Sequence, residues 1–295
     1  MARSDSVSVL IPARRGGALL QQVVSRVLAQ ETSRRVEVLV VDSGSEEREL
    51  AALSALGARV ERIAPESFDH GSTRDLAASM ADGAVLVFLN QDALPVGAGW
   101  LESLLAPFDR DDPPAAAQGA IREFPTEQLA ALGRRRFFWE SCGPRFYFTR
   151  ESRRWISENQ GIGFSTVHCA LSRSAWRELP FGAAPILEDK QWQAAATRRG
   201  WRIEPADDAV VWHTHDYDLS GLLKRCASEG YGWRRIGVRY PLRTALGDLA
   251  ERSLWREWRR GARSGEMRRV AEVVFPLARP LSLWWGNRWG SRSWS

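Results

Sequence analysis

Apolar strand patterns alternate with helical patterns between Ser6 and Leu89, and this alternation constrains the fold more than any other feature of the chain. Strands are expected at residues 6–12, 35–42, 58–63 and 84–89, and helices at 17–30, 45–57 and 71–83. Two of the helices end at a glycine, Gly57 and Gly83. Repeats of this length predict a largely parallel, open α/β sheet with right-handed crossovers and flanking helices.

Polar residues follow these strands at their carboxyl ends, which is where open α/β sheets bind ligands. The segments are Pro12–Arg15, Asp42–Ser45 and Asn90–Asp92. Alone, Asp42 could belong to a helix N-cap and Asp92 to a turn before Pro95. Two aspartates on one edge favour a ligand site instead. No glycine fingerprint of a dinucleotide fold or of a P-loop accompanies them.

The middle of the chain carries weaker patterns. Residues 134–148 are aromatic and basic, and they suit either a packed insert or a loop that contacts an acceptor. Residues 164–181 predict a strand and then a short helix. His168 lies in that strand, where a histidine is more often a structural hydrogen-bonding group than a catalyst.

Two later patterns carry acids and histidines. Glu188 and Asp189 open a helix that is expected to end at Gly200. Acids are common in the first turn of a helix because they complement the helix dipole. The next strand is expected to end in His213-x-His215, a spacing that puts both rings on one face of a strand. Such a pair could contribute to a metal site, although the pattern is weak by itself.

Positive charge is concentrated at the C-terminal end. Residues 216–295 carry a net charge of +8 and seven of the fourteen tryptophans, whereas residues 1–215 carry a net charge of −3. A basic, tryptophan-rich segment suits an anionic surface, and equally a solvated helical face with core tryptophans. We expect an α/β domain at 1–215 and a helical extension at 216–295, whose residues Val273–Trp294 could contact a membrane or a second subunit.

No apolar run approaches the ~18 residues of a membrane span, and Met1–Val7 lacks a signal-peptide pattern. The three scattered cysteines form no metal-binding or disulfide framework. These features favour a cytoplasmic protein.

Taken together, the chain resembles the rhamnosyltransferase-like branch of the family 2 glycosyltransferases, which are inverting enzymes of the GT-A fold. The resemblance covers about Val7 to Trp233. The segments that carry it are, in order, IPARRGG, VVDSGS, FDHGSTRDLA, FLNQDALP, ILEDKQW, VVWHTHDY and LLKRCASEGYGW.

The resemblance implies a role for each candidate residue. Asp189 would be the general base, with Glu188 beside it. Asp92 would bind a divalent cation, Mg²⁺ or Mn²⁺, that bridges two phosphates, and His213 would be a later ligand of that ion. The residues that would hold the nucleotide sugar are Pro12, Ala13, Arg14, Asp42, Arg74, Asn90 and Gln91. The residues assigned to the acceptor are Trp192 and His168.

The sequence departs from the family pattern at Asn90, Asp75 and Arg15. Asn90 replaces the first acid of the family's DxD motif, so the ion would be held by one carboxylate, an amide or water, and a histidine. Asp75 stands where the family usually has asparagine, and Arg15 replaces the asparagine of an Arg-Asn-Gly segment.

The resemblance also implies the reaction and its partners. The donor would be a dTDP- or UDP-linked rhamnose or another deoxyhexose, and the acceptor a glycan or a lipid-linked glycan. A lipid-linked acceptor would bring the basic tail to the anionic inner face of the membrane, and no nucleic-acid partner is expected.

Two other functions compete with this one. A non-catalytic protein that binds an anionic surface or nucleic acid would explain the pI of about 9.5, but the positive charge is confined to the tail and the ligand edge is acidic. A nucleotidyltransferase would need a glycine-rich first loop with a lysine, and the first loop here carries arginines.

Overall fold

The computed structural model describes residues 5–143, 146 and 148–291, and these form two compact units. The first unit consists of Met1–Arg122, Ile162–Ala184 and Glu188–His213, and the second of Glu123–Gly161, Pro185–Leu187 and Thr214–Ser295. Parts of the aromatic segment 134–148, and residues 292–294 of the expected tail, lie outside the described residues. The boundary expected between residues 215 and 216 stays a prediction.

Within the described residues, the first unit is built on an eight-stranded sheet with the order β3-β2-β1-β4-β7-β6-β8-β5. The strands are β1 (Ser6–Ala13), β2 (Arg35–Asp42), β3 (Arg59–Arg62), β4 (Val85–Leu89), β5 (Leu94–Pro95), β6 (Ala116–Arg122), β7 (His168–Ser172) and β8 (Ile203–Trp212).

The first four strands run parallel, as expected. Ala13 at the end of β1 lies opposite Asp42 at the end of β2, and Leu10 lies opposite Phe88 of β4. The carboxyl ends of these strands therefore share one edge. The expected α/β sheet is confirmed.

The other half of the sheet contains antiparallel pairs. β7 runs antiparallel to both β4 and β6, and β5 runs antiparallel to β8, whereas β6 and β8 are parallel. Leu89 at the end of β4 consequently lies opposite His168 at the start of β7. The sheet is therefore mostly parallel, with antiparallel strands inserted beyond β4.

Helices cover the sheet and supply its core. They are α1 (Gly17–Leu28), α2 (Glu47–Ala55), α3 (His70–Met80), α4 (Trp100–Leu105), α8 (Arg173–Glu178) and α9 (Glu188–Arg198). One apolar cluster joins Ala77 of α3 and Ala196 of α9 to Leu39, Phe88 and Cys169 of the sheet. Because side chains alternate along a strand, His168 lies on the opposite face from Cys169.

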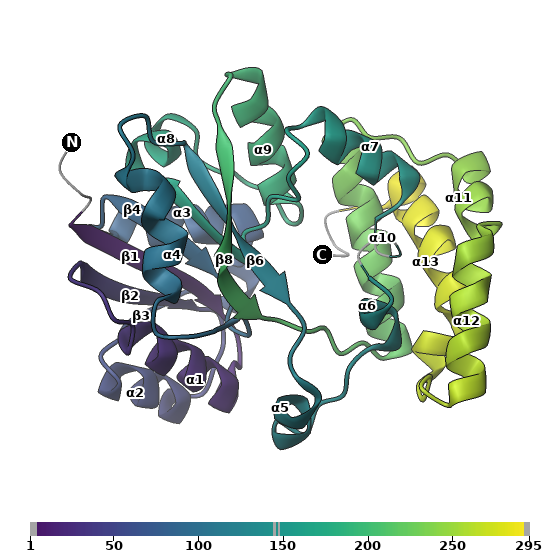
Figure 1. The fold of residues 1–295 in the computed structure, drawn as a ribbon, viewed down its shortest axis with the longest axis horizontal. Coiled ribbons are helices and arrows are strands. Elements are labelled where there is room, and N and C mark those ends of the chain that lie inside the picture. The colour runs from purple at the N-terminus through teal and green to yellow at the C-terminus, as the bar shows by residue number, and fades with distance from the viewer. Residues whose placement is uncertain (1–4, 144–145, 147, 292–295) are drawn as a thin grey trace. The chain divides into compact units, whose positions relative to one another are not determined.

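The second unit is helical (Figure 1). Its helices are α5 (Thr126–Ala131), α6 (Phe138–Ser141), α7 (Arg150–Glu158), α10 (Leu219–Arg235), α11 (Leu242–Leu249), α12 (Arg252–Ser264) and α13 (Val270–Trp289). α10 and α13 approach so closely at Gly230 and Gly286 that a Cβ on Gly286 would lie 1.8 Å from the carbonyl oxygen of Ala227. Within the described residues, no helix is long and apolar enough to cross a membrane.

Two prolines lie inside α13. Pro276 has no N–H to donate to the carbonyl oxygen of Glu272, four residues earlier. The indole Nε1 of Trp139 donates to that oxygen instead, at 2.7 Å. Trp139 also stacks on Phe275, with ring centroids 4.8 Å apart. The indole of Trp139, on α6, thus replaces the hydrogen bond that Pro276 cannot make within α13.

Candidate active site

The loop after β2 is organised by Asp42. Its Oδ2 accepts the backbone N–H groups of Gly44 and Ser45, each at 2.9 Å, and its Oδ1 accepts the Ser45 hydroxyl at 2.5 Å. The Ser45 oxygen in turn accepts the N–H of Arg15 at 2.8 Å. Asp42 is buried, and both of its oxygens order this loop. Its expected contact with a nucleotide stays a prediction.

The loop after β1 is tied to the loop after β4. The N–H of Arg14 donates to Gln91 Oε1 at 2.8 Å, and Gln91 Nε2 donates to the carbonyl oxygen of Arg14 at 3.3 Å. Pro12 and Ala13 are buried just before this point, whereas the Arg14 side chain is exposed. Gln91 therefore fixes the backbone from which an exposed guanidinium projects.

Arg74 joins the loop after β4 to the head of α9. From the buried face of α3 it donates to Asn90 Oδ1 at 2.9 Å and to the carbonyl oxygen of His70 at 3.0 Å. It also lies 3.2 Å from Glu188 Oε1. The amide that replaces the first DxD acid is thus bonded to an arginine, and Arg74 is 3% exposed. Its expected role in holding the nucleotide sugar, near the diphosphate or the base, stays a prediction.

Glu188 is ionised at the head of α9. Burial acts to raise the pKa of its carboxyl, but Arg74, His70 and the Thr166 hydroxyl together lower that pKa below its usual value. The Thr166 hydroxyl donates to Glu188 Oε1 at 2.6 Å. Glu188 is therefore a fixed, buried anion that neutralises Arg74.

Asp189 has a different environment from Glu188. Its Oδ1 accepts the N–H of Lys190 at 2.7 Å, and its Oδ2 lies 3.2 Å from Lys190 Nζ. The same Nζ donates to the carbonyl oxygen of Phe164. The Asp189 side chain keeps 12% of its surface exposed, twice the 6% of Glu188. Of the two acids, Asp189 is the one that solvent or a substrate can reach more easily.

Asp92 and His213 lie together in the first unit. Asp92 Oδ1 is 3.4 Å from His213 Nδ1, and the Asp92 side chain is 31% exposed. Adjacent ligands of an octahedral cation with bonds of about 2.1 Å are separated by roughly 3 Å. A carboxylate oxygen and an imidazole nitrogen at this distance fit two neighbouring positions around one ion.

These two side chains would supply only part of a coordination shell. Within the described residues, no group of three or more His, Cys, Asp or Glu side chains is arranged to hold a metal ion. Mg²⁺ in nucleotide sites commonly takes one or two protein ligands and completes its shell with phosphate oxygens and water. The pair fits a cation that arrives with a phosphorylated ligand.

The expected pairing of His213 with His215 is wrong. β8 ends at Trp212, so strand alternation does not place the two rings on one face. His215 Nδ1 lies 2.6 Å from Glu140 Oε1 within the second unit, whereas His213 lies beside Asp92. Each ring contacts a different carboxylate.

The two residues assigned to the acceptor are core residues, which corrects that assignment. His168 is fully buried; its Nε2 accepts the indole N–H of Trp100 at 2.8 Å. Trp192 is 1% exposed, donates to the carbonyl oxygen of Leu179 at 2.9 Å and packs on Phe164. Neither side chain presents a surface to a substrate.

Thr166 and Lys190 were not among the expected site residues. Lys190 directly follows the acid pair, so an ion pair between neighbouring residues could have been considered. Thr166 carries no comparable signal, because its contact with Glu188 spans 22 residues and depends on how β7 enters the sheet.

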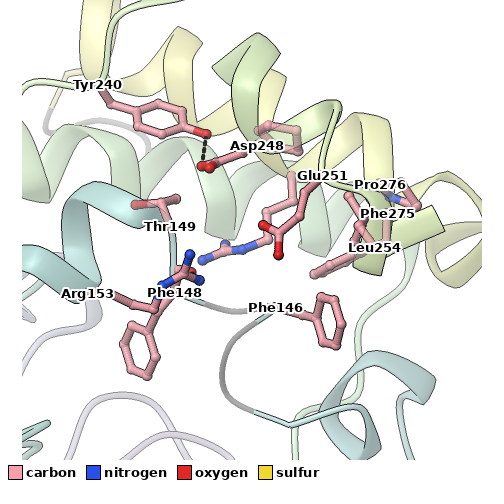
Figure 2. A pocket seen from close by; sticks show the side chains of 12 residues that line it. Phe146, Phe148, Thr149, Arg153, Tyr240, Asp248, Glu251, Leu254, Phe275 and Pro276 are labelled. Atoms are coloured by element: carbon pink, nitrogen blue, oxygen red, sulfur yellow. Dashed lines mark hydrogen bonds between the residues drawn. The ribbon is translucent and has the colours of Figure 1, made fainter. Parts of the chain in front are cut away.

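A small pocket lies within the second unit (Figure 2). Its volume of about 40 Å³ has room for a few water molecules. On one side the Tyr240 hydroxyl donates to Asp248 Oδ2 at 2.8 Å, and burial raises the pKa of Asp248. In this conformation the pocket is too small for a sugar nucleotide.

Comparison with known proteins identifies the family. The family described as "Glycosyl transferase family 2" matches residues 8–179. The chain is 27% identical over 222 residues to the O-antigen chain rhamnosyltransferase RfbN of Salmonella typhimurium, covering 72% of this chain and 67% of the relative. It is 26% identical over 220 residues to the O-antigen chain rhamnosyltransferase WbaN of Salmonella anatum, with the same two coverages.

Solved structures share the fold. The mannosyltransferase PcManGT from Pyrobaculum calidifontis, in complex with GDP-Man and Mn²⁺, superposes with a TM-score of 0.60 at 14% identity over 98% of this chain and 88% of its own. Glucosyl-3-phosphoglycerate synthase from Mycobacterium tuberculosis, in complex with Mn²⁺, UDP and glucosyl-3-phosphoglycerate, gives 0.57 at 17% identity, with coverages of 79% and 81%. The expected GT-A fold is confirmed. Because the family match spans more than half of the sequence, the chain belongs to glycosyl transferase family 2 and is a glycosyltransferase.

Proposed function

We propose that this glycosyltransferase moves rhamnose, or another deoxyhexose, from a nucleoside-diphosphate donor to a hydroxyl of a glycan or lipid-linked acceptor, with inversion at the transferred carbon. The observation that carries the proposal is the Asp92–His213 pair, 3.4 Å apart, in a family 2 chain. The names of the two Salmonella relatives support rhamnose. Family membership also favours an enzyme over a non-catalytic surface-binding protein.

Asp92 and His213 would hold a divalent cation, Mg²⁺ or Mn²⁺. The presence of Mn²⁺ with GDP-Man or UDP in the related structures supports this assignment. When bound, such a cation neutralises the diphosphate and stabilises the negative charge that grows as the sugar bond breaks. The exposed guanidinium of Arg14, on a backbone held by Gln91, would add positive charge at the same edge.

Asp189 would act as the general base. An acceptor hydroxyl must lose its proton as it attacks the sugar, and a single in-line displacement inverts the anomeric carbon. Asp189 suits this role because it is the more exposed of the two acids and sits at the start of a rigid helix. Glu188, ionised and paired with Arg74, would be a positioning residue that holds the head of α9.

The finer substrate identity and the location are proposals too. The donor would be linked to dTDP or UDP. We propose a cytoplasmic enzyme that is peripheral on the inner face of the membrane. The cysteines at positions 142, 169 and 226 are free thiols, which suits a reducing compartment.

The base assignment is tested by comparing Asp189→Asn with Glu188→Gln. We expect Asp189→Asn to lower kcat for transfer by ~10²–10⁴-fold and to leave the donor Kd unchanged. Glu188→Gln should instead reduce stability, because it leaves Arg74 without its buried counter-charge. Transfer by Asp189→Asn at near the wild-type rate would refute the base assignment.

The cation assignment is tested by calorimetric titration of dTDP and UDP with and without Mn²⁺. We expect Mn²⁺ to tighten nucleotide binding in the wild type, and Asp92→Ala and His213→Ala each to abolish this Mn²⁺-dependent gain. Asp82→Ala is a matched control, since Asp82 follows α3 and is not part of the pair. An unchanged Mn²⁺ effect in both pair variants would remove them from the site.

A further inference from the structure

The outward side of α13 is apolar. Its inner side packs Ala271, Phe275 and Leu283 into the second unit. Along its length, other apolar residues stand in solvent at spacings of three or four, each between 39% and 64% exposed. These residues, which we call the apolar stripe, are Val270, Val273, Leu277, Leu281, Trp285 and Trp289.

Such a helix is unusual on a protein surface. A surface helix normally presents polar residues to water on the side opposite its core face. α13 presents valine, leucine and tryptophan instead, and the neighbouring α11 adds Leu242 and Leu246, which are 42% and 51% exposed. Contiguous exposed apolar surface of this kind marks an interaction site.

A basic pocket of about 440 Å³ lies at the C-terminal end of α13. Tyr240 and Trp284 contribute aromatic walls, and none of the lining residues is acidic. Within the described residues, no ion pair is formed by Arg239, Arg243 or Arg288. The arginines that line this arginine pocket are Arg234, Arg239, Arg243 and Arg288.

One of these arginines is held in place by the backbone. Arg234 donates to the carbonyl oxygens of Arg288 and Gly290 at 2.8 and 2.7 Å, and so binds the last turn of α13. The side chains of Arg239, Arg243 and Arg288 are exposed. Several guanidinium groups around one hollow are suited to phosphate, which they can bind through two parallel hydrogen bonds.

We infer that the apolar stripe and the arginine pocket together form a docking surface for an anionic lipid bilayer. The stripe would enter the boundary between headgroups and acyl chains, where tryptophan is favoured. The arginine pocket would bind headgroup phosphates. This inference rests on the proposed peripheral location and names the surface that would produce it, whereas it does not depend on the proposed reaction.

The charge of this surface argues against other partners. A second copy would bring an identical patch to a two-fold interface, and this patch has arginines without acids to pair with them. A nucleic acid would satisfy the arginines but would leave the leucines and valines of the stripe in water. An anionic bilayer matches both parts.

The electrostatic part is tested with the triple variant Arg239→Gln/Arg243→Gln/Arg288→Gln. Binding to phosphatidylcholine vesicles, with and without phosphatidylglycerol, is measured by flotation at low salt. We expect the wild type to bind the anionic vesicles. Each arginine near the surface contributes roughly fivefold, so the variant should bind them about 100-fold more weakly.

A matched control removes the same charge elsewhere. The exposed arginines of the first unit chosen for it are Arg35, Arg177 and Arg198, each changed to glutamine. This control should bind the vesicles within about twofold of the wild type, since its arginines are outside the docking surface. If both triple variants weaken binding equally, only net charge matters and the inference fails.

The apolar part is tested with Leu277→Gln/Leu281→Gln. Deleting α13 is unsuitable because Phe275 and Leu283 belong to the core, whereas these exposed positions can change without unfolding the unit. We expect about tenfold weaker vesicle binding for each leucine, with circular dichroism and donor hydrolysis in solution unchanged.

Three results would overturn the inference. The first is a wild type that ignores anionic vesicles at low salt, and the second is an arginine variant that binds them as tightly as the wild type. The third is sedimentation showing a wild-type dimer that Leu277→Gln/Leu281→Gln converts to a monomer, because a second copy would then cover the stripe. Because donor hydrolysis is measured separately, failure of docking and failure of the proposed reaction are distinguishable.

Discussion

Acidification below pH 6.5 should destabilise this protein through His168, a residue that the sequence alone made a candidate for the acceptor site. Trp100 donates its indole N–H to His168 Nε2 at 2.8 Å, so this nitrogen carries no proton. Nδ1 faces the carbonyl oxygen of Ala120 at 3.4 Å, which can only accept a hydrogen bond. A second proton, on Nε2, would point at the donor of Trp100 in a site without solvent.

The size of the effect follows from the pKa. Burial lowers the pKa of His168 from 6.5 to about 3, against the weaker opposing effect of the Ala120 carbonyl. Between pH 6.5 and pH 3 the imidazole is therefore protonated in the unfolded chain but neutral in the folded chain. The free energy of unfolding consequently decreases as the pH falls through this range. Each pH unit in this window costs about 1.4 kcal/mol, which gives roughly 2 kcal/mol between pH 6.5 and pH 5.

The assay compares His168→Gln with the wild type by urea unfolding at pH 7.5 and pH 5. Glutamine offers an oxygen that can accept from Trp100, but it does not titrate. At pH 7.5 the variant should be less stable by about 1–3 kcal/mol, because it fills the site less well. At pH 5 the gap should shrink by roughly 2 kcal/mol, since only the wild type suffers the histidine penalty.

Other groups titrate equally in both proteins and cancel in this comparison. A stability gap that is the same at pH 7.5 and pH 5 would refute the buried, neutral histidine. An acceptor KM that rises in His168→Gln at pH 7.5, with the donor KM unchanged, would restore His168 to the acceptor site and overturn its assignment to the core.

Two further predictions concern packing and hydrogen bonding. Gly286→Ala should destabilise the second unit by about 1–3 kcal/mol in calorimetric unfolding, because its Cβ would lie 1.8 Å from the carbonyl oxygen of Ala227. The control is Gly247→Ala on α11, where an added Cβ would meet nothing within 4 Å, and it should be neutral or stabilising. Equal effects of the two substitutions would contradict the close helix crossing. Asp75→Asn should lower the free energy of unfolding in urea by about 1–3 kcal/mol. The reason is that the carboxylate accepts three N–H groups from residues 176–182, among them the Trp176 indole at 2.8 Å. A decrease of less than about 0.5 kcal/mol would show that asparagine accepts these hydrogen bonds equally well.

The first half of the sheet could be read from the sequence because its signals are local. β2 was expected at residues 35–42 and is found at Arg35–Asp42, since a continuous apolar run between polar segments is enough to define a buried parallel strand. The shared edge at Ala13 and Asp42 follows from the same pattern, because strands linked by helices run parallel and end together.

The candidate site could be read only in part. The family resemblance implied that Asp92 and His213 belong together, and the structure brings them to 3.4 Å. The helix pattern did not separate Glu188 from Asp189, because neighbouring acids at a helix start look alike, and only the family resemblance assigned the base to Asp189. Their difference depends on Arg74, which is 114 positions away from Glu188 in the chain and pairs with it through the fold.

The sequence by itself determined the local elements and the polar edge of β1, β2 and β4, since apolar period and breaker residues act over a few neighbouring positions. Only the tertiary structure decided that β7 enters the sheet antiparallel beside β4, which turns His168 inward against Trp100. It likewise decided that residues 123–161 join the C-terminal helices and that the outer side of α13 is exposed. The physical reason is that burial, ion pairing and pKa depend on groups brought together from distant parts of the chain. A local sequence pattern does not identify which distant residues it will contact.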